Sequence, residues 1–292
     1  MSGKSVLNWV IFIALALTWG SSFILMKRGL DAFSSSQVAA LRISMAFLFL
    51  LPLGIKHYSK ELWSNWKAAA GMGFLGNLIP AFLFTKAETL ISSALTGMLN
   101  SLTPVFTLIT GLLIFRVRVT GLQIIGIFIG LIATIGLLLL GGDKQSNANA
   151  LLGGGLVILA TVGYGFSVNI IKSKLSHLNA ISITLLALSI VGPLAIVYLF
   201  STDFVHVLRT HPLAMHSLGF VAILAIFGTA LSVIVYNILI REAGTLFAAS
   251  VTYAIPIVAM LWGMFDGEQV TWYHALCILG ILSGVWMINK SK

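Results

Sequence analysis

Long apolar runs separated by short polar segments fill the chain. Ten runs have about the length, roughly 20 residues, that a helix needs to cross a bilayer. None shows the two-residue alternation of membrane strands, so an all-α integral membrane protein is predicted. The predicted spans are Trp9–Met26, Ser36–Ile55, Ala68–Thr85, Leu90–Phe115, Val119–Leu140, Leu151–Ile171, Asn179–Phe200, Met215–Ile240, Leu246–Phe265 and Thr271–Ile288.

The fourth and ninth spans share a pattern. Pro104 and Pro256 lie 152 residues apart, and so do Gly111 and Gly263. A fixed offset of this kind is typical of an internal duplication. The two spans are five helices apart, so an odd-numbered repeat would insert the second copy upside down relative to the first.

The first and sixth spans also align, at an offset of 145 residues. This pairs Trp19 with Tyr164 and Ser22 with Ser167. We therefore predict ten transmembrane helices as two inverted five-helix repeats, residues 1–145 with helices one to five and residues 146–292 with helices six to ten.

Composition supports a membrane protein. Of the 292 residues 59% are hydrophobic and 9% charged, and the mean hydropathy is +1.04. Soluble domains carry about 25% charged residues. The net charge of +9 is scattered over short gaps between apolar runs, which favours lipid headgroups over nucleic acid as the partner. Cys277 is alone, so no disulfide framework is predicted.

The distribution of Lys and Arg predicts the orientation. With the N-terminus inside, inner segments carry eleven of these residues and outer segments five, Arg42 being left out because it lies within a span. The positive-inside rule then places both termini in the cytoplasm.

Four segments taken in order resemble the drug/metabolite transporter superfamily, EamA type: WGSSF with a following Lys, LRISMAFLFLLP, SALTGMLNSLTPVFT and GLQIIGIFIGLIATIGLLLL. The resemblance covers nearly the whole chain. It implies a permease of a bacterial inner membrane that exports or exchanges small organic metabolites, amino acids among them. The family commonly has a Gly-Glu pair after the fourth helix, where this chain has Phe115-Arg116. The second repeat keeps the pair as Gly267-Glu268.

Polar and aromatic side chains within otherwise apolar spans are the candidate substrate contacts, because inverted repeats build their site where the halves meet. Helix packing is the alternative reading of every Ser, Thr and Asn among them. The candidates are Trp19, Ser22, Asn77, Asn100, Thr103, Tyr164, Tyr236, Asn237 and Tyr253.

Three further residues are candidates for gating. Pro104 and Pro256 each remove a backbone donor within a span, which produces either a static kink or a bend that moves. Arg42 is an ionisable residue inside a span and therefore a functional candidate. It either snorkels outward or binds an anionic group such as a substrate carboxylate. The pair Lys86 and Glu88 is interpreted as a local surface pair.

Several activities find no support. No Asp or Glu lies in the middle of a span, so no carboxylate proton carrier is evident and facilitated diffusion or exchange is favoured. The chain has no Walker phosphate loop, and no cofactor is expected. The spacing of His206, His211 and His216 favours a solvated loop over a metal site.

We therefore predict a secondary transporter that moves a small-molecule substrate by alternating access. The alternatives are a membrane channel, or a non-transporting membrane subunit or enzyme.

Overall fold

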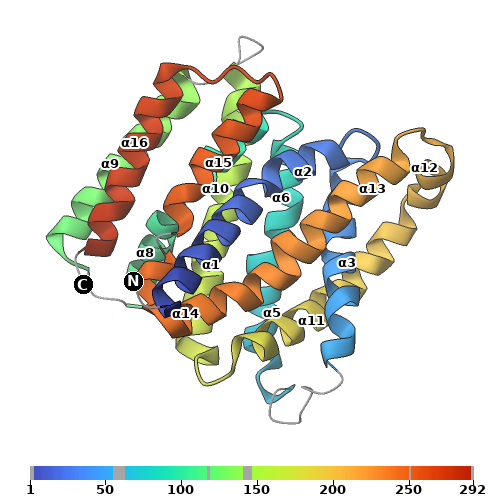
Figure 1. The fold of residues 1–292 in the computed structure, drawn as a ribbon, viewed down its shortest axis with the longest axis horizontal. Helices are drawn as coiled ribbons and strands as arrows, with labels where there is room; N and C mark the ends of the chain where they lie inside the picture. The colour runs from blue at the N-terminus through green and yellow to red at the C-terminus, as the bar shows by residue number, and fades with distance from the viewer. Residues whose placement is uncertain (1–2, 55–62, 117–118, 141–146, 250, 291–292) are drawn as a thin grey trace.

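The computed structural model describes residues 3–54, 63–116, 119–140, 147–249 and 251–290. Every regular element in these ranges is helical, as the sequence predicts (Figure 1). Both chain termini lie at one end of the bundle in Figure 1, called here the terminal end. The connection between α15 and α16 lies at the opposite end, called here the distal end.

The described residues of the first half form nine helical elements. Some spans are divided into two or three of them. In chain order they are α1 (Gly3–Gly20), α2 (Ser22–Gly29), α3 (Ser35–Gly54), α5 (Trp66–Gly73), the π-helix η1 (Phe74–Leu78), α6 (Ile79–Ala87), α7 (Ser93–Asn100), α8 (Thr103–Leu113) and α9 (Gly121–Leu140).

The second half follows a similar plan. Its elements are α10 (Asn147–Ile170), the π-helix η2 (Ile171–Leu175), α11 (Ala180–Ser201), α12 (Phe204–Thr210), α13 (Ala214–Ile223), the π-helix η3 (Leu224–Leu231), α14 (Ser232–Ala249), α15 (Val251–Phe265) and α16 (Trp272–Lys290). The loop predicted around His206 and His211 is therefore partly wrong, because α12 occupies it up to Thr210.

Eight helical segments of the described chain are long and apolar enough to cross a membrane, from Val6–Gly29 to Ala214–Tyr236. Ala254–Phe265 and Trp272–Ile288 are apolar but shorter. Each of the eight overlaps one of the first eight predicted spans, and the two shorter helices lie within the ninth and tenth, so ten membrane-crossing helices stay a prediction.

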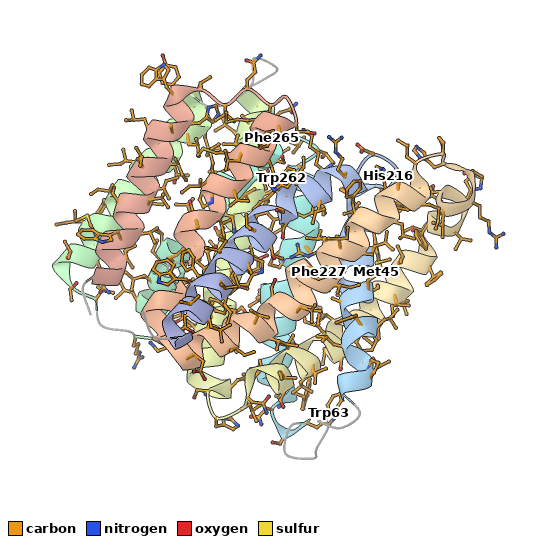
Figure 2. All side chains as sticks on the ribbon, viewed as in Figure 1. Met45, Trp63, His216, Phe227, Trp262 and Phe265 are labelled. Atoms are coloured by element: carbon orange, nitrogen blue, oxygen red, sulfur yellow. The ribbon has the colours of Figure 1, made fainter. Side chains whose placement is uncertain are left out.

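The surface is apolar to a degree that only a lipid environment accommodates. Phe265 is 85% exposed, Leu113 73% and Val197 70%. Figure 2 shows Trp262 and Phe265 near the distal end of α15, and Trp63 at the opposite end of the bundle from them. Exposed tryptophans near helix ends suit the two membrane interfaces.

Small residues allow the helices to approach closely. On α9, Gly126 lies so near α16 that an added Cβ would come within 2.5 Å of the Gly284 carbonyl oxygen. Close approach through small residues is typical of helix pairs in membranes. Figure 1 shows the two helices side by side at one flank of the bundle. A second pair, α3 and α11, buries Ile43 and Leu50 against Leu188.

Proline determines where the fourth span breaks. Pro104 has no N–H to donate to the carbonyl of Asn100, and the chain divides there into α7 and α8. The Thr103 hydroxyl donates to that carbonyl instead, at 2.8 Å. The matched Pro256 lies inside the continuous helix α15. The two prolines that the sequence matches at an offset of 152 residues therefore differ in local structure.

Candidate functional site

The first group of candidate residues lies where α1 meets η3 and α14. The Trp19 indole Nε1 donates to the Gly228 carbonyl at 3.2 Å. Its ring lies 5.2 Å from the ring of Tyr236, centre to centre. The Ser22 hydroxyl is buried and donates to the Thr18 carbonyl of its own helical segment at 3.1 Å. Trp19 and Tyr236 therefore share one location, and Ser22 borders it with its hydroxyl already engaged.

Arg42 joins this group from α3. Its Nε donates to the Thr229 hydroxyl at 3.0 Å, and Nη1 approaches the Met26 sulfur at 3.9 Å. The side chain is half-buried, and no carboxylate of the described residues lies within ion-pair distance of it. A guanidinium has five N–H donors, so Arg42 keeps donor capacity for a further acceptor.

Aromatic rings from three elements link this group to α10. Phe23 of α2 lies 6.0 Å from Phe84 of α6, and Phe84 stacks on Tyr164 at 5.8 Å with an angle of 26° between the rings. Trp19 and Tyr164 pack against the same core cluster, which contains Phe23 and Phe84. The two aromatic residues predicted to be repeat-equivalent therefore border one interior region.

The remaining polar candidates lie at irregular points of the helices. Asn100 ends α7 and accepts the Thr103 hydroxyl at its carbonyl, so both belong to the break in the fourth span. Asn77 lies in η1, half-buried, with its amide 4.0 Å from the Met72 sulfur. The side chains of Asn237 and Tyr253 lie outside the described part of the structure.

The distal end carries a cluster of ion pairs. The Lys27 ammonium lies 2.5 Å from a carboxylate oxygen of Asp266 and 2.7 Å from one of Glu268. Arg28 also pairs with Asp266, and it lies 3.7 Å from Asp31. This distal ion cluster connects α2 to the segment between α15 and α16.

Glu268 also caps α7. Its carboxylate accepts the backbone N–H groups of Ser93 and Ala94 at 3.0 and 2.9 Å, and the Ser93 hydroxyl at 2.8 Å. Burial acts to raise the pKa of Glu268, but the hydrogen bonds from Lys27, Ala94 and Ser93 outweigh it and hold the pKa below its ordinary value. The negative charge at this helix N-terminus is therefore stabilised.

The Gly-Glu pair found by sequence has a structural basis. Gly267 has φ +80°, which a side chain would strain, and it directs the following residue back toward α7. Glu268 then fills the space beside Gly263, where an added Cβ would lie 2.6 Å from the carboxylate. Arg116, in the corresponding region of the first half, also has a positive φ of 55°.

Glu88 does not form the predicted surface pair with Lys86. Both of its carboxylate oxygens are buried and lack a hydrogen-bond partner among the described residues, whereas Lys86 is exposed. The prediction was wrong because Glu88 follows the last turn of α6 with its carboxyl group buried, where the charges of Lys27, Arg42 and Glu268 act on it.

Sequence reasoning did not select Lys27, Asp266, Glu268 or Glu88 as site residues. The Gly-Glu pair was the available signal for Glu268, but its partner at the N-terminus of α7 is 175 residues away. Among the described residues, no group of three His, Cys, Asp or Glu side chains could hold a metal ion.

Comparison with known proteins identifies the family. The sequence pattern of the EamA-like transporter family matches residues 7–139 and again residues 151–290. The chain belongs to the EamA-like transporter family. The resemblance found in the sequence is thereby confirmed, and this EamA-like chain is a multi-pass membrane protein of a family of transporters, which are not enzymes.

Relatives of the EamA-like chain span its whole length. A protein of Archaeoglobus fulgidus named "Uncharacterized transporter" is 25% identical over 98% of this chain and 99% of its own length. The "Uncharacterized inner membrane transporter YedA" of Escherichia coli strain K12 is 26% identical over 96% of this chain and 89% of its own. The "Uncharacterized transporter YyaM" of Bacillus subtilis strain 168 is 24% identical over 97% and 95%.

A solved structure described as "Crystal structure of protein" has the same fold. It superposes with a TM-score of 0.62 at 16% sequence identity, and the match covers 96% of this chain and 95% of the other. The fold is therefore known among solved structures.

Proposed function

We propose that this chain is a secondary transporter that moves small organic metabolites, amino acids among them, across a bacterial inner membrane by alternating access. Membership of a transporter family and relatives named as transporters support the class. The inner-membrane location is supported by the name of YedA.

Contacts between equivalent positions support an inverted repeat, residues 1–145 against 146–292. Gly20 allows α1 to approach α15, where an added Cβ would lie 2.4 Å from Val258. Gly165 allows α10 to approach α8, where an added Cβ would lie 2.8 Å from the backbone of Phe106. The glycines are 145 residues apart and their partners 152, the same offsets that relate the repeats in the sequence.

The π-helices give a second match. A Cβ on Gly76 of η1 would lie 2.2 Å from the Ser167 hydroxyl, and one on Gly228 of η3 would lie 3.0 Å from the Ser22 hydroxyl. Gly76 and Ser22 belong to the first repeat, and Gly228 and Ser167 are their equivalents in the second. Each contact is therefore the repeat-related copy of the other. Single π turns within helices are frequent at functional sites, and here each repeat has one in its third span.

One observation carries the proposed site. Trp19 and Arg42, both from the first repeat, donate hydrogen bonds to Gly228 and Thr229, consecutive residues of a π-helix in the second repeat. A relative movement of the halves must break or exchange these two bonds. A substrate at this junction would contact both halves and so respond to their movement.

The chemistry of the junction suggests the substrate class. Arg42 is cationic and has spare donors, so it suits a carboxylate. Trp19, Tyr236 and Tyr164 provide aromatic surfaces for an apolar side chain. A solute with one carboxylate and an apolar portion fits these groups, and zwitterionic amino acids are the class to test first.

The orientation follows from the basic residues. With both termini in the cytoplasm, the distal ion cluster faces the periplasm. Because Lys27 pairs with Asp266 and Glu268 across the two repeats, we infer that the cluster holds the periplasmic side closed in this conformation. Pro104 and Pro256 remain candidate hinges.

Uptake by proteoliposomes tests the site. Purified protein would be assayed with labelled zwitterionic, anionic and cationic amino acids and with neutral metabolites. Arg42→Gln is expected to abolish uptake of carboxylate solutes, while Arg209→Gln, an exposed arginine of α12, leaves it unchanged. Equal uptake by both variants would contradict the role of Arg42.

Trp19 has its own matched control. Trp19→Phe keeps a ring beside Tyr236 but removes the bond to Gly228, which we expect to lower uptake roughly 5- to 10-fold, equivalent to about 1–1.4 kcal/mol. Trp272→Phe changes a 65% exposed tryptophan and should transport as the unmodified protein does. If Trp19→Phe transported normally, the site would lie elsewhere.

A further inference from the structure

Glu88 has a buried carboxyl group that plays no part in the transport cycle proposed above. It follows α6 directly, just beyond the span Trp66–Ala87. Neither carboxylate oxygen touches solvent, and neither has a hydrogen-bond donor among the described residues. A buried carboxylate without donors or a paired cation is strongly unfavourable, and taking up a proton is the usual way to remove its charge.

The charged groups around Glu88 come from three other elements. Lys27 of α2 and Arg42 of α3 act on it as cations, and Glu268 acts as an anion from the connection between α15 and α16. Both cations have hydrogen-bond or ion-pair partners elsewhere, since Lys27 binds Asp266 and Glu268, and Arg42 binds Thr229. Glu88 is left without a direct counter-ion.

We propose that Glu88 is a proton-binding site of the transporter, which takes up a proton when the distal end closes and releases it when that end opens. The proposal rests on the transport function proposed above and adds the proton as the coupled ion. In the closed conformation the bound proton is sealed from solvent by the same packing that buries the carboxyl group.

The electrostatics of the site agree with this geometry. Burial raises the pKa of Glu88 most, the charge of Glu268 raises it further, and Lys27 and Arg42 lower it, which leaves the pKa well above its ordinary value. Opening the distal end would hydrate the carboxyl group and return its pKa toward about 4.3, so the proton leaves at neutral pH.

Because the pKa is raised in the closed conformation, protonation stabilises closure at low pH. That stabilisation is lost as the pH rises through the raised pKa. Mild alkalinity therefore favours opening of the distal end.

The proton is also linked to the substrate through Arg42. The positive charge of Arg42 lowers the pKa of Glu88. A substrate carboxylate bound to Arg42 would cancel that effect and increase the proton affinity of Glu88. By reciprocity, a proton on Glu88 increases the affinity of Arg42 for the carboxylate.

Infrared spectroscopy of the full-length protein in lipid nanodiscs tests the proton site without any substrate. At neutral pH the protein should show the carbonyl stretching band of a protonated carboxylic acid. Glu88→Gln should lose this band, whereas Glu242→Gln, an exposed glutamate of α14, should retain it. Absence of the band at neutral pH in the unmodified protein overturns the proposal, and this reading does not depend on how any variant folds.

Counterflow of labelled zwitterionic amino acids, measured from mildly acidic to mildly alkaline pH, tests the coupling. With the labelled solute at saturating concentration, so that its affinity does not limit exchange, the unmodified protein and Glu242→Gln should exchange faster as the pH rises, and Glu88→Gln should lose this dependence. Identical pH profiles for all three overturn the coupling. An infrared band without exchange of any solute would instead refute the proposed function, so the two failures are distinguishable.

Discussion

Replacing Glu268 by alanine should destabilise the protein strongly, because one buried carboxylate connects three parts of the chain. Glu268 is 8% exposed and accepts four hydrogen bonds, from the Lys27 ammonium, the Ser93 hydroxyl and the backbone N–H groups of Ser93 and Ala94. Glu268→Ala removes all four and leaves the two N–H groups at the start of α7 without an acceptor.

The magnitude follows from those contacts. Hydrogen bonds to a charged group contribute about 1.5–3 kcal/mol each, and they are not additive when they share one acceptor. Removing one partner of a buried ion pair costs about 3–5 kcal/mol. Lys27 is 34% exposed and keeps Asp266 as a partner, so a loss of about 3–4 kcal/mol in the free energy of unfolding is expected. Glu268→Gln keeps one carbonyl acceptor and should lose roughly half as much.

The assay is reversible unfolding in mixed detergent micelles, followed by tryptophan fluorescence. Glu242→Ala is the control, since an exposed glutamate should change stability by no more than about 0.5 kcal/mol. The pKa of Glu268 is lowered in the folded protein. Its stabilisation is therefore present above the unfolded pKa of about 4.3 and is lost as the pH falls through the folded value. If Glu268→Ala and Glu242→Ala unfolded alike, the capping role of Glu268 would be refuted.

Two further predictions concern helix geometry, measured in the same unfolding assay. Gly165→Ala places a Cβ 2.8 Å from the Phe106 backbone and should cost about 1–3 kcal/mol, whereas Gly155→Ala meets nothing within 4 Å and should be neutral or stabilising by up to about 1 kcal/mol. A smaller loss for Gly165 than for Gly155 would contradict the close approach of α10 and α8. Thr103→Val removes the donor to the Asn100 carbonyl and should cost about 1–3 kcal/mol, while Thr103→Ser keeps it. Equal stability of the two Thr103 variants would show that water replaces the hydroxyl.

The sequence was sufficient for the helical class and for the eight spans that are long and apolar enough to cross a membrane, because about 20 apolar residues in a row have one stable structure in lipid. It also paired Trp19 with Tyr164, and the structure brings both against the core cluster that holds Phe23 and Phe84.

The details within the spans could not be predicted. A π-helix depends on a single extra residue in a helical turn, and the apolar periodicity around Gly76 and Gly228 does not reveal it. Pro104 indicated a distortion of the fourth span, but Pro256 in the same register lies within a continuous helix. The tertiary contacts of each span decide which outcome follows.

The pairing of charged residues at the distal end was the feature that the sequence predicted least well. Glu88 and Lys86 are two residues apart in sequence, which suggested a local pair. Side chains two positions apart on a helix do not face each other, so this pair does not form. The partners of Lys27 and Glu268 lie up to 241 residues away. Pairings at that distance come from the folded arrangement of α2, α7 and the connection after α15.

Counterflow by the unmodified protein tests alternating access most directly. Vesicles preloaded with an unlabelled zwitterionic amino acid would be diluted into a trace of the labelled form, and the label inside would be followed over time. A carrier with one site exposed alternately to each side predicts that the label accumulates transiently above its equilibrium level and that entry saturates. Entry that only approaches equilibrium, without accumulation or saturation, would contradict the account and indicate an open channel.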